Sequence, residues 1–570
     1  MVDVFTSELN PTTRAAVLGR LDDTSYDVLV IGGGVTGAGV ALDAVTRGLR
    51  VALVEKRDWA AGTSSRSGKL IHGGLRYLEQ LDFGLVREAL KERRLFLKRL
   101  CPHLAKPIQF IYPLKHRVWE RAYMGSGLAL YDTMGGAGAV PMHGHLGQSR
   151  ILEMAPGLEP GELVGGLTFY DVQIDDARHT CELVRTAAAR GADVLSAMVV
   201  DNLVVEDVNG VATVRGAEVT DAESGTRHTI RASVVVNATG VWSDQIRRMA
   251  PGSPSFSVRA SKGIHITVPR DRIDSTISIF VRAEDSVIFV RTWGDHWLIG
   301  TTDTTWSQGL DHPAATSEDI EYLLRNVNRV LRRPLSVDDI DGVYSGLRPL
   351  VTEEDVTTNS KLSREHALDI IPGLVTIAGG KYTTYRVMAQ DVVDEVSKQL
   401  GVDAPCLTQK VRLLGAQALG TTSGAVTALA RRIGLTDEQI EHLLGRYGSL
   451  TGELLGLIQE NPELAQPVPG AERYLLAEAR YAVTHEGALH LDDVITRRTR
   501  IAIETHHRGL DSAAAIARVM ADYLGWTPEQ EEAELAHYRE RVRVERAAER
   551  ESTDAGAAAV RETVKDLRLA

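Results

Sequence analysis

Residues 26–55 read YDVLVIGGGVTGAGVALDAVTRGLRVALVE, and this stretch decides the fold of the first domain. An apolar strand pattern runs into the glycine motif G-x-G-x-x-G. A helix pattern of small residues follows and leads to a second apolar strand that ends at Glu55. Gly32 permits the tight turn out of the strand, Gly34 lets a pyrophosphate approach bare backbone, and Gly37 lets the helix pack close to the sheet. The helix N-terminus favours phosphates, and Glu55 can accept hydrogen bonds from ribose hydroxyls. Because all four parts occur in order, we predict a dinucleotide site rather than an ordinary glycine-rich turn.

Length and composition indicate a multidomain protein of a reducing compartment. The chain has 570 residues, which is more than one core normally organises. A net charge of −12 argues against a large nucleic-acid footprint but leaves room for a local basic patch. The three cysteines are far apart and lack metal-ligand spacing, so we expect a cytosolic protein with neither disulfides nor a metal site. The first ten residues do not resemble a signal peptide. The sequence contains no run of about 18 apolar residues, the length that a membrane-spanning helix needs.

Two later junctions repeat the strand–glycine pattern. The apolar residues 233–236 run into the sequence NATG at 237–240, where small residues let backbone meet a cofactor. The apolar residues 374–377 break at AGGK, and a helix pattern begins near Thr383 and continues to about Leu400. This second junction would direct another helix N-terminus at an anionic group.

The rest of the chain has three contrasting patterns. Residues 255–350 alternate between polar and apolar, which predicts an antiparallel sheet in a second lobe. Residues 415–545 are helical in pattern, with a loop expected at Pro467 and Pro469. Residues 546–570 are highly charged and rich in alanine, so we expect a frayed helix or a disordered tail there.

An amphipathic helix is predicted over residues 83–100. Its apolar residues span an arc of about 140°, and a narrow opposite stripe carries Arg87, Lys91, Arg94 and Lys98. Residues 115–124 then combine basic residues with Trp119 and tyrosine, a mixture that suits an anionic bilayer surface. The residues alone slightly favour the alternative, in which the stripe is a solvated face and the tryptophan belongs to the core.

The long stretch AAGTSSRSGKLIHGGLRY at 60–77 is rich in glycine, serine and cations, as functional loops often are. Together with four further motifs it resembles the D-amino-acid-oxidase-like flavoprotein superfamily and, more closely, the FAD-dependent glycerol-3-phosphate dehydrogenase family. The motifs are IGGGVTGAG at 31–39, SRSGKLIHGGLRYLE at 65–79, IGTTD at 299–303, YSGLRP at 344–349 and GGKYTTYR at 379–386. The helical region with RRTR at 497–500 is also similar. The resemblance covers roughly residues 25–545. Gly68 and Tyr382 depart from the residues usual in the family and put only local contacts in question.

The resemblance implies an α/β FAD-binding domain of Rossmann type with an interleaved antiparallel substrate lobe and an all-α C-terminal domain. We divide the chain accordingly into a lead-in at 1–25, an oxidoreductase domain at 26–405, a helical domain at 406–545 and a charged tail at 546–570. The FAD part would comprise about 26–110, 170–245 and 345–400, and the substrate lobe about 111–169 and 250–345.

The family implies oxidation of sn-glycerol 3-phosphate to dihydroxyacetone phosphate, with FAD taking the hydride and a membrane quinone re-oxidising the flavin. A quinone acceptor implies a cytoplasmic protein held peripherally on the inner face of the membrane. For residues 87–123 it therefore favours a membrane-binding surface over a solvated face. The family resemblance is also compatible with a homodimer. Three alternatives stay open: an oxidase that uses oxygen, an amine or amino-acid oxidase of the same fold, and a flavin-binding scaffold without turnover.

The residues that match the family's motifs give a candidate site. His265 is the natural base for the C2 hydroxyl proton, although a buried structural histidine is about as common, and Arg348 could polarise the oxygen instead. Lys381 completes the catalytic set and would stabilise the reduced flavin. The candidate substrate-binding residues, cations that suit a phosphate and a neighbouring tyrosine, are Arg76, Tyr77, Arg348, Arg364 and Lys381. The candidate FAD contacts are Gly32, Gly34, Val35, Thr36, Gly37, Glu55, Thr63, Ser64, Ser65, Lys69, Leu70, His72, Gly73, Gly74, Val199, Ala238, Thr239, Gly240, Gly346, Gly380, Lys381, Thr383 and Thr384.

Overall fold

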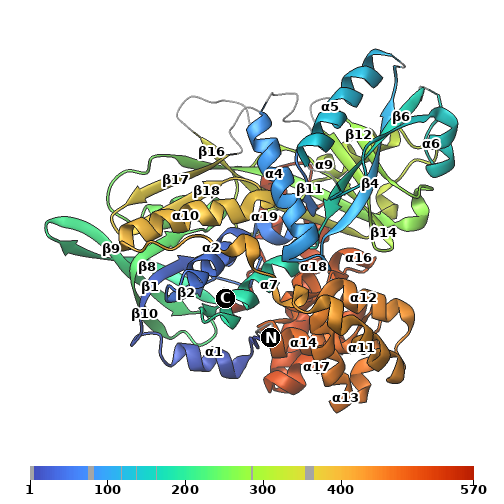
Figure 1. Ribbon diagram of the computed structural model, residues 1–570. Helices are drawn as coiled ribbons and strands as arrows, with labels where there is room; N and C mark the ends of the chain where they lie inside the picture. Colours follow the sequence, from blue (N-terminus) through green and yellow to red (C-terminus); the bar gives the residue numbers. More distant parts are fainter. Residues whose placement is uncertain are drawn as a thin grey trace.

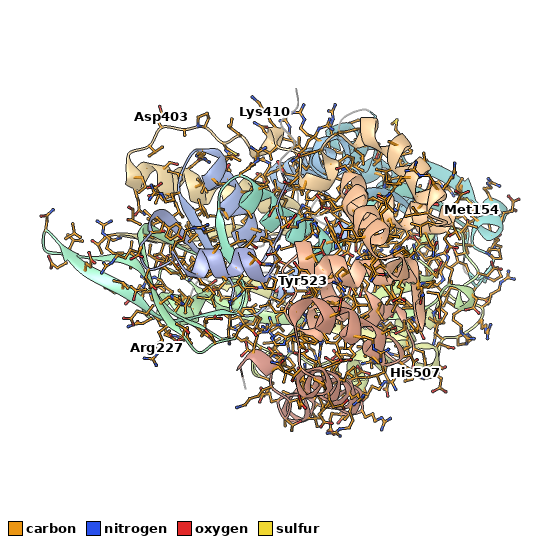
Figure 2. The ribbon with its side chains drawn as sticks, turned by 90° about the horizontal axis from the view of Figure 1, so that it is seen from below. Met154, Arg227, Asp403, Lys410, His507 and Tyr523 are labelled. Carbon is orange, nitrogen blue, oxygen red and sulfur yellow. The ribbon has the colours of Figure 1, made fainter. Side chains whose placement is uncertain are left out.

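A computed structural model describes residues 6–74, 82–116, 118–135, 138–161, 163–283, 287–352 and 365–569. Two large sheets and a helical C-terminal region make up the molecule (Figure 1). Met154, at the end of α6, and Arg227, at the start of β10, mark opposite edges in the view from below, and Tyr523 lies on the helical region between them (Figure 2).

The first sheet is built around the stretch that opens the sequence. Its main path runs β17-β18-β10-β1-β2-β7, and the pairs of β18, β10, β1, β2 and β7 are all parallel. β2 and the C-terminal halves of β1 and β10 are apolar and buried because both faces of the sheet are covered there. The bounds of the strands on the main path are β1 (Ser25–Ile31), β2 (Val51–Val54), β7 (Asp193–Leu195), β10 (Arg227–Asn237), β17 (His366–Ile371) and β18 (Leu374–Gly379).

Three helices pack on one face of this sheet, α2 (Val35–Thr46), α7 (Asp176–Ala189) and α10 (Tyr385–Leu400) (Figure 1). The antiparallel hairpin β8 (Met198–Val208) and β9 (Val211–Asp221) continues from β10 and projects from the molecule (Figure 1). Its turn at Asn209 and Gly210 has φ of 56° and 82°, as the sequence predicts for a tight hairpin. The three glycine-rich strand ends, after β1, β10 and β18, therefore meet at one edge of the sheet.

The second sheet confirms the predicted antiparallel lobe. Its path is β15-β11-β14-β13-β12-β4-β6-β3, with β16 added to β11 and β5 added to β6. The pairing of β12 with β4 is parallel and the other described pairings are antiparallel. The strands are β3 (Leu70–Ile71), β4 (Lys106–Leu114), β5 (Gly144–Gly147), β6 (Gly165–Gln173), β11 (Ser257–Pro269), β12 (Ser278–Arg282), β13 (Val287–Trp293), β14 (His296–Gly300), β15 (Thr304–Thr305) and β16 (Gly342–Thr352).

Alternation along these strands divides the lobe into two faces. Ile264, Ile266, Val290 and Ile299 point to a core that α6 (Gln148–Met154) and α9 (Ser317–Asn328) help to form. The residues between them point the other way, toward the first sheet. One face of the second sheet is thus free to line a site.

Two further helices lie beside each other at the edge of this lobe, α4 (Phe83–Leu95) and α5 (Trp119–Gly135) (Figure 1). The sequence-predicted helix over 83–100 is α4 followed by a π-turn at Phe96–Leu100. In the part of the chain that the structure describes, the helices are all too short or too polar to cross a bilayer.

The C-terminal region is helical as predicted. Its elements of eight residues or more are α11 (Leu419–Arg432), α12 (Asp437–Tyr447), α13 (Thr451–Glu460), α14 (Leu476–His485), α17 (Leu510–Leu524), α18 (Pro528–Ala548) and α19 (Asp554–Arg561). The expected loop at Pro467 and Pro469 is instead a short hairpin, β19 (Pro467–Val468) with β20 (Ala471–Leu475).

The expectation of a frayed or disordered tail is wrong. α19 buries Ala557 and Ala558 against the second sheet and its loops, and Asp554 forms an ion pair with Lys262 of β11. Because these partners lie about 300 residues away, the sequence of the tail alone did not indicate its packing.

Candidate active site

A cavity of about 1240 Å³ lies between the glycine-rich edge of the first sheet and the free face of the second. Pockets for a single small ligand usually occupy about 300–1,000 Å³, so this cavity has room for a dinucleotide and a substrate. It collects residues from chain positions 31 to 388.

The glycines of the first motif have the roles that their spacing predicts. Gly32 has φ of 113°, and a Cβ there would lie 2.7 Å from the carbonyl oxygen of Ala238. A Cβ on Gly37 would run into the carbonyl oxygen of Gly32. Gly34 caps the N-terminus of α2 and leaves bare backbone facing the cavity. This cradle fits the pyrophosphate of FAD.

Glu55 is held at the end of β2. Its carboxylate accepts hydrogen bonds from the backbone N–H of Gly33 (2.7 Å) and of Arg57 (2.8 Å). Burial raises the pKa of Glu55, while these two N–H groups oppose the shift. The carboxylate is therefore fixed where the ribose of an adenosine would lie.

The far end of the cavity is the free face of the second sheet. Strand alternation brings Phe289 and Arg291 of β13 to this face together with His265 of β11 and Arg348 of β16. Gly263 and Gly346, paired across β11 and β16, leave it flat there. A flat, partly aromatic wall opposite a dinucleotide cradle suits an isoalloxazine ring.

His265 lies at the centre of this wall. Its ring stacks on Tyr344, with centroids 4.9 Å apart and 12° between the planes, and it covers Gly300 of the neighbouring strand. Burial, then the charges of Arg291 and Arg348, lower the pKa of His265 well below its usual value. The imidazole is therefore neutral near pH 7 and has a lone pair available to accept a proton.

Arg348 is held by its neighbours. It donates to the Thr301 hydroxyl and the Thr302 carbonyl, both at 3.1 Å, and forms an ion pair with Asp303 at 3.3 Å. Its side chain remains about one-quarter exposed to the cavity. The IGTTD motif thus orients the arginine of the YSGLRP motif.

The third junction completes the wall. Gly379 and Gly380 both have positive φ, 77° and 76°, and Lys381 follows them at the cavity surface. The hydroxyl of Thr383 donates to the His72 carbonyl and accepts from the His72 N–H, both at 3.3 Å. This contact brings the SRSGKLIHGGLRYLE and GGKYTTYR motifs together across 311 residues of chain.

Arg291 is a site residue that the motifs did not reveal. It is 1% exposed, and its Nη1 and Nη2 have no hydrogen-bond partner among the described residues. Burial lowers the pKa of its guanidinium to about 10, and Tyr344 and Asp176 oppose this. A cation in phase with Phe289 and Trp293 on an apolar strand was the sequence signal for an inward-facing charge.

The structure brings most of the sequence-predicted residues to one cavity. Those that line it are Gly32, Gly34, Val35, Thr36, Glu55, Thr63, Ser64, Leu70, His72, Gly74, Val199, Ala238, Thr239, Gly240, His265, Gly346, Arg348, Gly380, Lys381 and Thr383. It does not bring Gly37, Ser65, Lys69, Gly73 or Thr384 to the cavity wall. Arg76, Tyr77 and Arg364 lie outside the described residues.

Lys69 differs most from its predicted place. Its amine is completely buried behind the wall, where it donates to the Ser65 carbonyl (3.0 Å) and pairs with Asp176 (2.6 Å). Arg500 of the C-terminal region binds the same carboxylate. Burial and the charge of Arg500 lower the pKa of Lys69 to about 8. The Lys69 amine therefore lies away from the cavity wall, in an ion pair within the oxidoreductase domain that Arg500 extends to the C-terminal region.

Comparison with known proteins agrees with this geometry. The model of the FAD dependent oxidoreductase family matches residues 27–386, and that of the C-terminal domain of alpha-glycerophosphate oxidase matches residues 406–531. A glycerol-3-phosphate dehydrogenase of Mycobacterium leprae is 50% identical over 564 residues, which cover 99% of this chain and 96% of that protein. This chain belongs to the FAD-dependent glycerol-3-phosphate dehydrogenase family. Its cofactor is FAD.

More distant relatives also match most of this chain. The crystal structure of a glycerol-3-phosphate dehydrogenase from Bacillus halodurans, complexed with FAD, is 30% identical with a TM-score of 0.76. The match covers 94% of this chain and 98% of that one. The human mitochondrial glycerol-3-phosphate dehydrogenase is 36% identical over 92% of this chain and 74% of its own length.

Proposed function

We propose that the chain oxidises sn-glycerol 3-phosphate to dihydroxyacetone phosphate. The observation that carries this proposal is a neutral, buried histidine between two guanidiniums, Arg291 and Arg348, in the cavity that holds the FAD cradle. The names of the relatives supply the substrate, and the two cations supply a reason for an anionic one.

Four charged or titratable residues of the cavity wall have separate roles in the proposed reaction. Arg348 can donate to a phosphate or to the C2 oxygen from a fixed position, and the uncompensated charge of Arg291 attracts the dianion into the cavity. His265 accepts the proton of the C2 hydroxyl. FAD, when bound, supplies the acceptor for the hydride of C2. Lys381 places a positive charge at the N-terminal side of α10 and at the cavity surface, where it would stabilise the reduced flavin.

The proposal predicts that anaerobic addition of sn-glycerol 3-phosphate bleaches the flavin of the purified protein. Glycerol and D-amino acids, which lack the phosphate, should leave it oxidised. Bleaching by an amino acid instead would support the amino-acid-oxidase alternative, and no bleaching by any of them would support the scaffold.

We further propose that the electrons pass to a membrane quinone and that the enzyme lies on the inner face of the cytoplasmic membrane. Arg87, Lys91 and Arg94 of α4 and Lys98 of the following π-turn are all exposed. Trp119 and Tyr123 of the neighbouring α5 are 59% and 53% exposed, although both are large and apolar. Cations beside exposed aromatic rings favour an anionic bilayer surface.

The cavity extends toward the same helices. Met124 of α5 and Leu85 of α4 line it, followed by Phe169, Phe280 and Phe289 nearer its centre. An apolar, aromatic route between the flavin and the docking face would suit a quinone ring. We infer that the acceptor enters between α4 and α5.

Flotation with anionic liposomes tests the docking face. Changing Lys91, Arg94 and Lys98 together to glutamate should abolish binding, because attraction becomes repulsion. Changing Lys398, Arg431 and Arg432 to glutamate alters net charge equally on distant helices and should leave flotation intact. Equal flotation of both variants would contradict the assignment. Fast re-oxidation of the reduced enzyme by oxygen, with none by a quinone analogue, would favour the oxidase.

A further inference from the structure

A second, smaller cavity lies behind the loop that lines the flavin site. Its volume is about 100 Å³, and it is enclosed by residues of the 63–66 turn, the start of β16, the RRTR segment, α18 and α19. Arg66 lines this cavity and the main one, so the turn separates the two spaces.

Six guanidiniums and two carboxylates line the cavity. Carboxylates outside it pair with three of these arginines: Asp492 with Arg497 and Arg541, and Asp175 and Asp176 with Arg500. Two carboxylates face the cavity, and both are already engaged. Glu549 is bound by both terminal nitrogens of Arg508, at 2.5 and 2.7 Å, while Glu545 is shared by Arg541 (3.0 Å) and Arg561 (3.5 Å). The six guanidiniums on the walls belong to Arg66, Arg497, Arg500, Arg508, Arg541 and Arg561.

Arg66 is the cation that this arrangement leaves uncompensated. Its Nη1 approaches the Ser345 carbonyl at 3.5 Å, and no carboxylate of the described chain lies within ion-pair distance of it. Burial, then the charges of Arg57, Arg541 and Arg561, lower its pKa to about 9. The Arg66 side chain is only partly buried and also lines the main cavity, but a cation in a protein wall without a counter-ion favours an anionic ligand beside it.

Two further hydrogen-bond donors complete the site. The hydroxyl of Ser345 and the Nε of Arg508 both lie at the cavity, are buried, and have no hydrogen-bond partner among the residues described. Each of these two residues is 6% exposed. Unsatisfied donors facing an enclosed space indicate an acceptor that the protein itself does not supply.

We propose that this cavity binds a small tetrahedral oxyanion of the phosphate class, held by Arg66, Arg541 and Arg561 and by the Ser345 hydroxyl. The volume equals about three water molecules at ~30 Å³ each, which suits one such ion. Guanidinium forks match the geometry of its oxygens. The site is separate from the one that binds the substrate, and the argument for it does not depend on the substrate's identity.

An anion bound in this cavity would connect two parts of the fold. It would join the 63–66 turn, which lines the flavin cavity, to α18 and α19 of the C-terminal region. A ligand that binds only the folded arrangement stabilises it by mass action. Phosphate should therefore raise the melting temperature of the holoenzyme.

Calorimetric titration of the holoenzyme with inorganic phosphate tests the proposal. The main cavity can also attract phosphate, so Arg348→Met serves to weaken that second component. We expect the wild type and Arg348→Met to share one phosphate-binding component. That component should weaken at least about tenfold in Arg541→Gln and in Arg561→Gln, because each loses a charge-assisted hydrogen bond. Arg325→Gln, on the exposed face of α9, should bind as the wild type does.

Loss of folding is distinguished from loss of the site by two controls. Arg561→Lys keeps the charge and should recover most of the affinity. Arg541→Gln and Arg561→Gln each deprive Glu545 of a partner and should lower the melting temperature, so bound flavin per protein, which should match that of the wild type, checks that they fold. The proposal is overturned if Arg541→Gln and Arg561→Gln bind phosphate like the wild type. It is equally overturned if all phosphate binding disappears in Arg348→Met.

Discussion

At the scale of single residues, the site depends on charges placed around one neutral histidine. His265 is 5% exposed and lies under two guanidiniums, so protonating it is unfavourable until an anion enters. Its role as proton acceptor and the attraction of an anionic substrate then have the same electrostatic origin.

Arg291→Met tests this coupling. The variant should raise the KM for glycerol 3-phosphate about tenfold, since a buried cation that attracts the dianion is lost. Removing a positive charge also raises the pKa of His265. Because the base must be neutral, the acid limb of the kcat/KM profile should move to higher pH. Unchanged KM and an unmoved acid limb would contradict the assignment, and Arg325→Met is the matched control.

The sequence predicted two residues that the structure places at the cavity: Arg348, because it lies in the YSGLRP motif, and His265, because its reference pKa is near neutral. It missed Arg291 because that residue lies in no motif, and its one local signal, a cation in phase with Phe289 and Trp293, does not identify a partner. Only the pairing of β13 with β14, and of β14 with β11, places Arg291 beside the histidine. Lys69 was misassigned for the opposite reason, since its motif is distinctive but its partner Asp176 lies 107 residues away.

At the scale of elements, local rules determined most of the fold. Period-two and period-3.6 patterns, together with the glycines, identified β1, α2, β2 and the antiparallel lobe before any tertiary contact was known. These elements are stabilised by burying apolar side chains whose spacing is already visible in the local sequence. The packing of α19 was not predictable, because it depends on Lys262 and on apolar residues of a distant lobe.

Gly37→Ala tests how closely α2 must approach the sheet. A methyl group would run into the Gly32 carbonyl, so the helix N-terminus should move and the pyrophosphate should lose its backbone donors. We expect loss of most of the bound FAD, measured by flavin absorbance per protein. Gly127→Ala adds the same methyl on α5, where nothing lies within 4 Å, and should keep its flavin. Full flavin content in Gly37→Ala would contradict the proposed packing.

At the scale of the whole molecule, buried ion pairs connect the domains. Asp175 and Asp176 at the start of α7 bind Arg500, and Arg178 binds Glu486. These pairs join the FAD-binding sheet to the C-terminal helices through charges that cannot be removed singly without leaving a partner unpaired. The helical region therefore supports the back of the active site rather than acting as a separate unit.

His490 forms ion pairs of this kind, and their contribution to stability can be measured as a function of pH. It pairs with Glu534 of α18 (2.6 Å) and with Glu223 of the β9–β10 turn (3.0 Å). Burial opposes its charge, but these two hydrogen bonds outweigh that effect and raise its pKa from 6.5 to about 9. The stabilisation is complete below pH 6.5 and is lost as the pH rises toward 9.

The wild type should accordingly lose about 3 kcal/mol of unfolding free energy over that range, at about 1.4 kcal/mol per pKa unit. His490→Gln should be less stable at pH 6.5 and should show a flatter decline in melting temperature toward pH 9. His507→Gln, at an exposed pair, should retain the wild-type slope. Parallel curves for the wild type and His490→Gln would contradict the assigned role.

The most direct test of the central claim is the rate of flavin reduction after anaerobic mixing with sn-glycerol 3-phosphate, either unlabelled or deuterated at C2. The account predicts rapid bleaching in the wild type and slower bleaching with deuterium. In His265→Asn it predicts reduction slowed at least about 100-fold, with flavin content unchanged. A flavin that stays oxidised with this substrate, or a His265→Asn variant that is reduced at the wild-type rate, would contradict it.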